Sequence, residues 1–153
     1  MVELSAYVDD DMHELRRLRL DSGASISCVS EEALAKDKDF LLSHGKLHRL
    51  ITPVKLSGLA SAYARVTRVL VGVQLIIGHA RCSHNLQVVP KLVCGYLMGH
   101  DFVRDYDIHV WLSRRVATMS IPLGMLMGAA DYRSTQVIDI QYVTDAVVLE
   151  LAL

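Results

Sequence analysis

Apolar and polar residues alternate along most of the chain, a pattern typical of β-strands whose two faces meet different surroundings. The longest such run covers residues 69–77 and is rich in valine and isoleucine, which favour extended backbone. Two more runs, residues 2–8 and 14–20, flank Asp9–Asp11, whose acidic side chains suit a turn. We therefore predict an all-β fold in which a hairpin leads the chain to Asp21.

One short helix is predicted among these strands. Residues 30–36 favour a helix because Ser30 can cap its start and two glutamates follow in the first turn. Further strands are expected at residues 81–89 and 115–119. The chain has 153 residues and no internal repeat, which suits one domain with its own core.

Charge and cysteine content narrow the functional classes. Sixteen basic residues balance seventeen acidic ones, so the net charge near zero does not indicate nucleic acid or a membrane surface as a partner. The three cysteines, Cys28, Cys82 and Cys94, form no Cys-x-x-Cys pair and suit a reducing compartment. The N-terminus lacks the pattern of a secretory leader, and no segment reaches the length of a membrane span. We expect a soluble protein of the cytoplasm.

The main candidate for chemistry is Asp21-Ser22-Gly23-Ala24-Ser25, which follows an apolar strand and looks like the catalytic turn of an aspartic protease. Peptide hydrolysis without a metal, a cofactor or a covalent nucleophile needs one group that takes a proton from water. It needs a second group that gives a proton to the carbonyl oxygen. Two carboxylates that share one proton perform both roles, as in aspartic proteases. The turn occurs once here, so the second carboxylate must come from another copy of the chain.

Each neighbour of Asp21 has an expected role in such a turn. Ser22 would bond across the axis between two copies, and Gly23 would allow the two backbones to approach closely. Ala24 is small enough to lie beneath the site, and the Ser25 hydroxyl can satisfy nearby backbone groups. Asp, Ser and Gly are also common in ordinary turns, so the tripeptide alone is a weak signal.

A second motif lies downstream. The segment Tyr96–Val103 is similar to the "apolar, apolar, Gly, any, Asp, aromatic or apolar" signature of retroviral and retrotransposon proteases. In that family the glycine, here Gly99 after Leu97 and Met98, closes a loop beneath the active site, and the residues that follow start a helix. Asp101 is expected to bond the backbone of this loop rather than to act as an acid.

The chain therefore resembles a retropepsin-like aspartic protease of the Gypsy or Pao class of long-terminal-repeat retrotransposons, over roughly residues 2–119. The resemblance implies a closed β-barrel with one or two short helices, and a homodimer in which each copy supplies Asp21. It implies a second copy and a polypeptide substrate as partners, and no cofactor or metal. The expected activity is endopeptidase processing of a retroelement polyprotein, in the cytoplasm and within a polyprotein or virus-like particle.

Some features depart from the family pattern. Ser22 stands where threonine is usual, and an acid and arginine paired in many viral members are replaced by Ser25 and His100. The candidate flap tip, Ser57-Gly58-Leu59-Ala60, contains one glycine. These departures leave an alternative open: a retropepsin-fold module with weak or no activity, kept for dimerisation or peptide binding.

Residues 120–153 lie outside the resemblance, and we take residues 1–119 as the protease domain. A proline and two glycines within residues 122–128 mark a loop, and residues 136–153 are strand-like and strongly apolar. This extension would be a hairpin at the dimer interface or a linker toward the next part of a polyprotein. A fragment of that next part is the third interpretation.

No metal site is indicated. His44 and His48 have the spacing of ligands on a helix, but Gly45 lies between them and the glutamate of a His-Glu-x-x-His motif is absent. Cys82 and His84 lie too close together on a strand-like segment, without a second pair, to form a zinc site. Serine-nucleophile motifs such as Gly-x-Ser-x-Gly are also missing.

Overall fold

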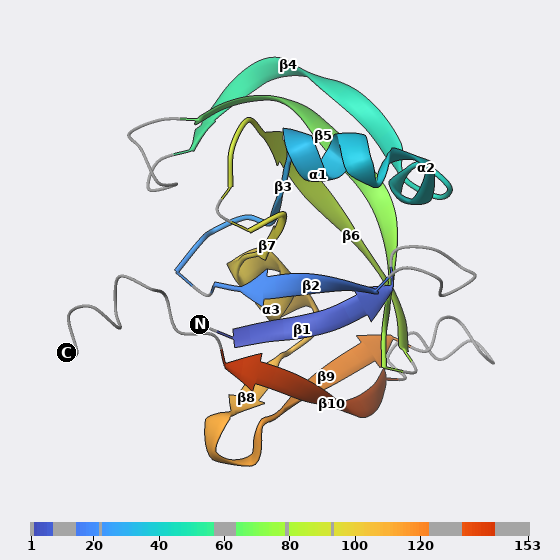
Figure 1. The fold of residues 1–153 in the computed structure, drawn as a ribbon, viewed down its shortest axis with the longest axis vertical. Coiled ribbons are helices and arrows are strands. Elements are labelled where there is room, and N and C mark those ends of the chain that lie inside the picture. The colour runs from blue at the N-terminus through green and yellow to red at the C-terminus, as the bar shows by residue number, and fades with distance from the viewer. Residues whose placement is uncertain are drawn as a thin grey trace.

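The fold consists mainly of strands with a few short helices (Figure 1). The structure is a computed structural model and describes residues 2–7, 15–21, 23–56, 64–78, 80–92, 94–122 and 133–142. The strands are β1 (Val2–Tyr7), β2 (Leu15–Leu20), β3 (Cys28–Ser30), β4 (Lys46–Leu56), β5 (Ala64–Ile77), β6 (Ala80–Val89), β7 (Tyr96–Met98), β8 (His109–Trp111), β9 (Val116–Pro122) and β10 (Arg133–Tyr142). The helices are α1 (Glu31–Lys36), α2 (Lys38–Leu41), α3 (His100–Asp105) and the 3₁₀ helix η1 (Leu112–Arg114).

Six strands form a closed barrel. Hydrogen-bonded neighbours follow the order β5, β6, β3, β7, β2 and β1, and the pairing of Tyr7 with Ile76 joins β1 back to β5. β4 lies outside this ring against β5, and β10, β9 and β8 extend in that order from β1. The predicted all-β closed barrel with short helices is confirmed.

The alternation in the sequence separates the inside of the barrel from its outside. In β6, burial alternates residue by residue from Ala80 to Leu86, and in β1 both Leu4 and Ala6 are fully buried. Removing such side chains from water stabilises the fold by about 25 cal/mol per Å² of apolar surface. Phe102 of α3 is the largest fully buried side chain of this core.

The position of β7 between β2 and β3 brings segments that are distant in the sequence together. β7 lies between β2 and β3, parallel to β2 with Met98 opposite Leu20, and antiparallel to β3 with Leu97 opposite Cys28. The chain that connects β2 to β3 must therefore pass the end at which β7 leaves the sheet. The Asp21 turn consequently meets the loop that contains Gly99.

Most expected elements are present. β1 and β2 form the hairpin that leads to Asp21, with Val2 opposite Leu20, and the turn of this hairpin lies outside the described residues. α1 begins as predicted, because the hydroxyl of Ser30 accepts a hydrogen bond of 3.0 Å from the amide of Ala33.

Other elements differ from the sequence-based expectation. β5 begins at Ala64, well before the predicted run, because its first half carries polar residues that blur the alternation. α2 has four residues, too few to leave a helical period in the sequence. β9 continues to Pro122, where a loop was expected; this proline stands at the end of the pairing, opposite Arg133, where little of the ladder is lost. Residues 143–153 lie outside the described residues.

No helix in the described part of the chain is long and apolar enough to cross a membrane.

Candidate active site

Asp21 lies at the tip of the turn that follows β2. Its backbone amide donates to the carbonyl of Met98 at 2.9 Å, which ties the turn to the end of β7. The amide of Gly23 donates to Oδ1 of Asp21 at 2.9 Å, and the amide of Ala24 donates to the Asp21 carbonyl at 3.1 Å. The carboxylate is thus oriented by its own turn while the side chain stays half-exposed.

The Gly99 loop packs directly against this turn. The amide of His100 donates to the carbonyl of Ala24 at 2.6 Å. A β-carbon added to Gly99 would lie 2.6 Å from the carbonyl oxygen of Ile26 and 2.8 Å from that of Ala24. Both obstacles are backbone atoms, so they cannot move without moving the turn. Glycine is needed here for close approach of two backbones, and the extended torsion of Gly99 places no further demand on it.

A buried polar network supports the contact from below. The hydroxyl of Ser27 donates to Oδ1 of Asp101 at 2.7 Å and accepts from the amide of Gly99 at 3.0 Å. The amide of Ser27 donates to Oδ2 of Asp101 at 3.2 Å. Nε2 of His84, on β6, lies 3.0 Å from the same Oδ2. We call Ser27, Asp101 and His84 the brace.

Asp101 is ionised within the brace. Burial alone would raise the pKa of its carboxyl, but the hydrogen bonds from Ser27 and the neighbouring His84 hold that pKa below its ordinary value. The carboxylate also accepts from the amide of Phe102 at 2.8 Å. With these partners, Asp101 holds the loop and the turn together.

The two sequence motifs therefore meet in space. The turn contributes Asp21, Gly23 and Ala24, and β7 with the start of α3 contributes residues 97–101. Leu97 and Met98 point into the protein and are buried.

Other predicted site residues are not part of this contact. Ser25 and His100 are both exposed, and no hydrogen bond between their side chains is observed among the described residues. Ser22 and the flap candidates 57–60 lie outside the described residues. The roles expected of Ser22 and of the flap stay predictions.

A small apolar cluster adjoins the turn. Its buried members are Cys28, Val66, Val89 and Leu97, and the partly buried Ala24 and Leu50 pack against them. Val66 comes from β5 and Leu50 from β4, so this cluster connects the Asp21 turn to the two-stranded β4–β5 ribbon. The turn that carries Asp21 is thus packed through Ala24 against a buried apolar cluster.

Two of the brace residues were missed in the sequence. Ser27 lies outside the motif Asp21–Ser25, and His84 was considered in the sequence only as a zinc ligand, which was rejected. Its position was nevertheless informative, because every second residue of β6 from Ala80 to Leu86 faces inward and His84 is one of them. A histidine on an otherwise apolar inward face needs a polar partner.

Cys28 and Cys82 are buried, and His44 and His48 lie on different parts of the fold. The described residues contain no group of three or more His, Cys, Asp or Glu side chains that could hold a metal ion. His44 lies after α2 and His48 on β4, so the two do not share a helix. Burial raises the pKa of Cys28 and of Cys82 to about 12, so both stay protonated and are poor nucleophiles.

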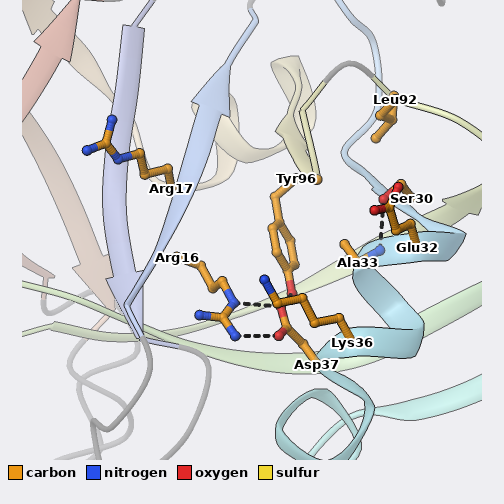
Figure 2. Close-up of a pocket in the computed structure, with 10 residues that line it drawn as sticks. Arg16, Arg17, Ser30, Glu32, Ala33, Lys36, Asp37, Leu92 and Tyr96 are labelled. Carbon is orange, nitrogen blue, oxygen red and sulfur yellow. Dashed lines mark hydrogen bonds and ion pairs between the residues drawn. The ribbon is translucent and has the colours of Figure 1, made fainter.

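A second polar site lies near the junction of α1 and α2 (Figure 2). Nε and Nη2 of Arg16 donate to Asp37 at 2.8 and 2.5 Å, and the hydroxyl of Tyr96 donates to it at 2.5 Å. Burial would raise the pKa of Asp37, but these hydrogen bonds hold it below its ordinary value. The cavity beside them measures about 320 Å³. Because all of these bonds converge on one carboxylate, the group anchors α1 to the barrel.

Comparisons with known proteins agree on the fold. No protein-family model and no curated protein sequence matches the chain. The retroviral protease-like domain of Ddi1 from Leishmania major has a TM-score of 0.56 at 10% identity, covering 78% of this chain and 87% of that one. The EIAV protease in complex with the inhibitor HBY-793 has a TM-score of 0.51 at 14% identity, covering 72% and 91%. The chain therefore has the retropepsin-like fold of retroviral protease-like domains.

Proposed function

We propose that the chain is an aspartic endopeptidase that works as a homodimer, with Asp21 of each copy as a catalytic residue. The observation that carries this proposal is the turn itself. A half-exposed carboxylate is held by the Gly23 amide, on a backbone that is bonded to Met98 of the second motif. The retropepsin-like fold supplies the setting in which such a turn can face a second copy.

The proposed chemistry follows from the state of this carboxylate. Oδ1 of Asp21 accepts from the Gly23 amide, whereas Oδ2 receives no hydrogen bond from any other described residue. One Asp21 of the dimer, ionised, would take a proton from the attacking water. The other, protonated, would give its proton to the carbonyl oxygen of the substrate. Two carboxylates that share a proton titrate as a pair, so activity should fall at both ends of the pH range.

Association is supported by an apolar surface next to the turn. A groove of about 320 Å³ is lined by Val2 and Leu20 from the first hairpin and by Val103, Ile108, Val110 and Leu112 from the C-terminal half. Leu112 of this lining is 56% exposed, and its neighbour Trp111 is 51% exposed. Exposed apolar groups gathered in this way are typical of a protein interface. Because Leu20 immediately precedes Asp21, a second copy on this surface would bring a second turn close.

The sequence motifs are the basis for proposing a natural substrate and a location in the cell. The motifs favour processing of a retroelement polyprotein, in the cytoplasm or within a virus-like particle. The comparison with the Ddi1 domain adds that similar folds also occur outside viral polyproteins.

The test is Asp21→Asn. Asparagine keeps the size and the hydrogen bond from Gly23 but cannot exchange the proton. Purified variant should fold and associate as the wild type does, and should lose cleavage of a peptide substrate and binding of a statine-type inhibitor. Asp39→Asn, an exposed carboxylate on α2, is the matched control and should keep full activity.

Retention of substantial cleavage by Asp21→Asn would remove the proposal. Loss of activity in both variants would indicate a general effect of the substitutions. A wild type that binds peptides without cleaving them, at any pH, would favour the alternative of an inactive binding module.

A further inference from the structure

Charge is distributed unevenly along this chain. Residues 40–100 contain seven Lys and Arg residues and no Asp or Glu, whereas the remaining residues contain nine basic and seventeen acidic ones. The net charge near zero is therefore the sum of a positive middle segment and a negative remainder. Most of this segment forms β4, β5 and β6 on one side of the barrel (Figure 1).

The β4–β5 ribbon holds most of these cations. They are Lys46, Arg49, Lys55, Arg65 and Arg68. The register places Arg49 opposite Arg68 and Lys55 opposite Arg65. Like charges directly opposite each other destabilise a pair of strands. The ribbon contains two such pairs of cations, and an anion bound beside them would reduce the repulsion.

The described protein supplies only one such anion. Glu31 of α1 lies 3.2 Å from Arg68 in an exposed ion pair. Lys55 and Arg65 are exposed and form no ion pair with any other residue that the structure describes. Arg49 is also exposed and forms no ion pair with any other described residue. These three side chains therefore carry positive charge that no described carboxylate neutralises.

The ribbon is also connected to the candidate active site. Val66, next to Arg65, is fully buried in the apolar cluster that includes Ala24 of the catalytic turn. Arg65 and its opposite neighbour Lys55 point to the other, exposed face of the ribbon. A polypeptide bound at Asp21 and continuing past the ribbon would come under the influence of these charges.

We propose that the exposed face of the β4–β5 ribbon, through Lys55 and Arg65, selects polypeptide substrates that carry glutamate or aspartate in the segment that leaves the site and continues past the ribbon, an inference that rests on the proposed peptidase function of the Asp21 site. Exposed aliphatic side chains lie on the same two strands, with Ile51 fully exposed and Val54 and Val71 each 38% exposed. They suit an acidic polypeptide with apolar residues. β4 and β5 contain no Phe, Tyr or Trp on which nucleic-acid bases could stack, which disfavours a nucleic-acid strand as the occupant.

The first experiment measures binding without cleavage. The Asp21→Asn protein is titrated with two labelled peptides of the same length, one with glutamates and the other with glutamines at the same positions. The glutamate peptide should bind about tenfold more tightly at low salt, and the preference should shrink as sodium chloride screens the charges. Because no cleavage is measured, this result does not depend on whether the wild type proves to be a peptidase.

The second experiment locates the effect. Lys55→Glu/Arg65→Glu in the Asp21→Asn background should abolish the preference for the glutamate peptide. Lys38→Glu/Arg104→Glu changes the net charge equally at exposed positions outside the ribbon and should keep it. If the charge reversal prevents folding, Lys55→Gln/Arg65→Gln should still weaken the preference.

Three results would overturn the proposal. One is equal binding of both peptides at low salt. Another is an equal loss of preference in the ribbon variant and in its control. The third is tight, salt-sensitive binding of a single-stranded oligonucleotide by a protein that ignores the glutamate peptide, which would assign the ribbon to nucleic acid.

Discussion

Two carboxylates of this molecule lie in opposite environments. Asp37, with a side chain that is 1% exposed, receives hydrogen bonds from Arg16 and from Tyr96. Asp21 is half-exposed and receives one side-chain hydrogen bond from the described residues, from Gly23. The three hydrogen bonds to Asp37 and its ion pair with Arg16 favour the anion and leave it little acceptor capacity for a water molecule. An undersaturated carboxylate at the tip of a rigid turn keeps that capacity, and the difference separates an anchor from a candidate catalyst.

The largest expected effect removes the anchor. Asp37→Ala should lower the free energy of unfolding by about 3 kcal/mol, because Arg16 and the hydroxyl of Tyr96 lose their shared acceptor. Chemical denaturation measures this change. Asp39→Ala, at an exposed position on α2, is the control and should stay within about 0.5 kcal/mol of the wild type.

The contrast between Asp21 and Asp37 would be wrong if substitution of either residue had the same effects on stability and activity. Asp21→Ala should leave the free energy of unfolding nearly unchanged and remove activity, whereas folded Asp37→Ala protein should keep its activity. A loss of stability in Asp21→Ala as large as that in Asp37→Ala would show that Asp21 is a structural residue.

The next effect concerns the support of the Asp21 turn. Gly99→Ala should lower the free energy of unfolding by about 2 kcal/mol, because the new methyl group would press against the backbone of Ile26 and Ala24. Activity should fall with it, since the displaced backbone belongs to the turn. Gly72→Ala is a useful contrast: that glycine has a positive φ of 73° but open space around it, so any loss of stability should leave the activity of the folded protein unchanged.

A smaller effect is expected from the brace. Asp101→Asn should lower kcat about tenfold with little change in KM, because the turn is held by fewer and weaker hydrogen bonds while the substrate surface is untouched. His84→Gln keeps a donor toward Asp101 and should recover most of the activity lost in His84→Ala. A change confined to KM would indicate that the brace shapes the binding surface rather than the turn.

Features of this fold that depend on adjacent residues can be predicted from the sequence, whereas contacts between distant residues cannot. The Asp21 turn and the Gly99 loop are local motifs, in which neighbouring residues determine the backbone, so both could be recognised from a few adjacent letters. The alternation of strands is likewise local. The anchor at Asp37 could not be recognised, because Arg16 and Tyr96 are 21 and 59 residues away from it in the chain.

The brace shows the same limit. Ser27 and Asp101 are 74 residues apart, and only the threading of β7 between β2 and β3 brings them together. His84 was visible as a polar residue on an inward strand face, yet the identity of its partner depended on that same topology.

The smallest effect is a dependence of stability on pH. The folded-state pKa of Asp37 lies below the ordinary value of 3.8, so its contribution is complete above that value and is lost as the pH falls through the lower folded-state pKa. The difference in Tm between the wild type and Asp37→Asn should therefore be constant near neutral pH and shrink below about pH 4. A difference that grows toward acid would contradict the assigned direction of the shift.

The central claim is that two copies of Asp21 form one active site, and subunit mixing tests it most directly. Wild-type protein at a fixed concentration is equilibrated with increasing amounts of Asp21→Asn protein, and cleavage of a peptide is measured at the pH at which the wild type is most active. Mixed dimers hold one carboxylate, so we predict that activity falls toward zero as the inactive chain is added in excess, and that the specific activity of the wild type also falls on dilution. Activity that is unchanged by the added chain, from a wild type that stays monomeric, would contradict the shared site.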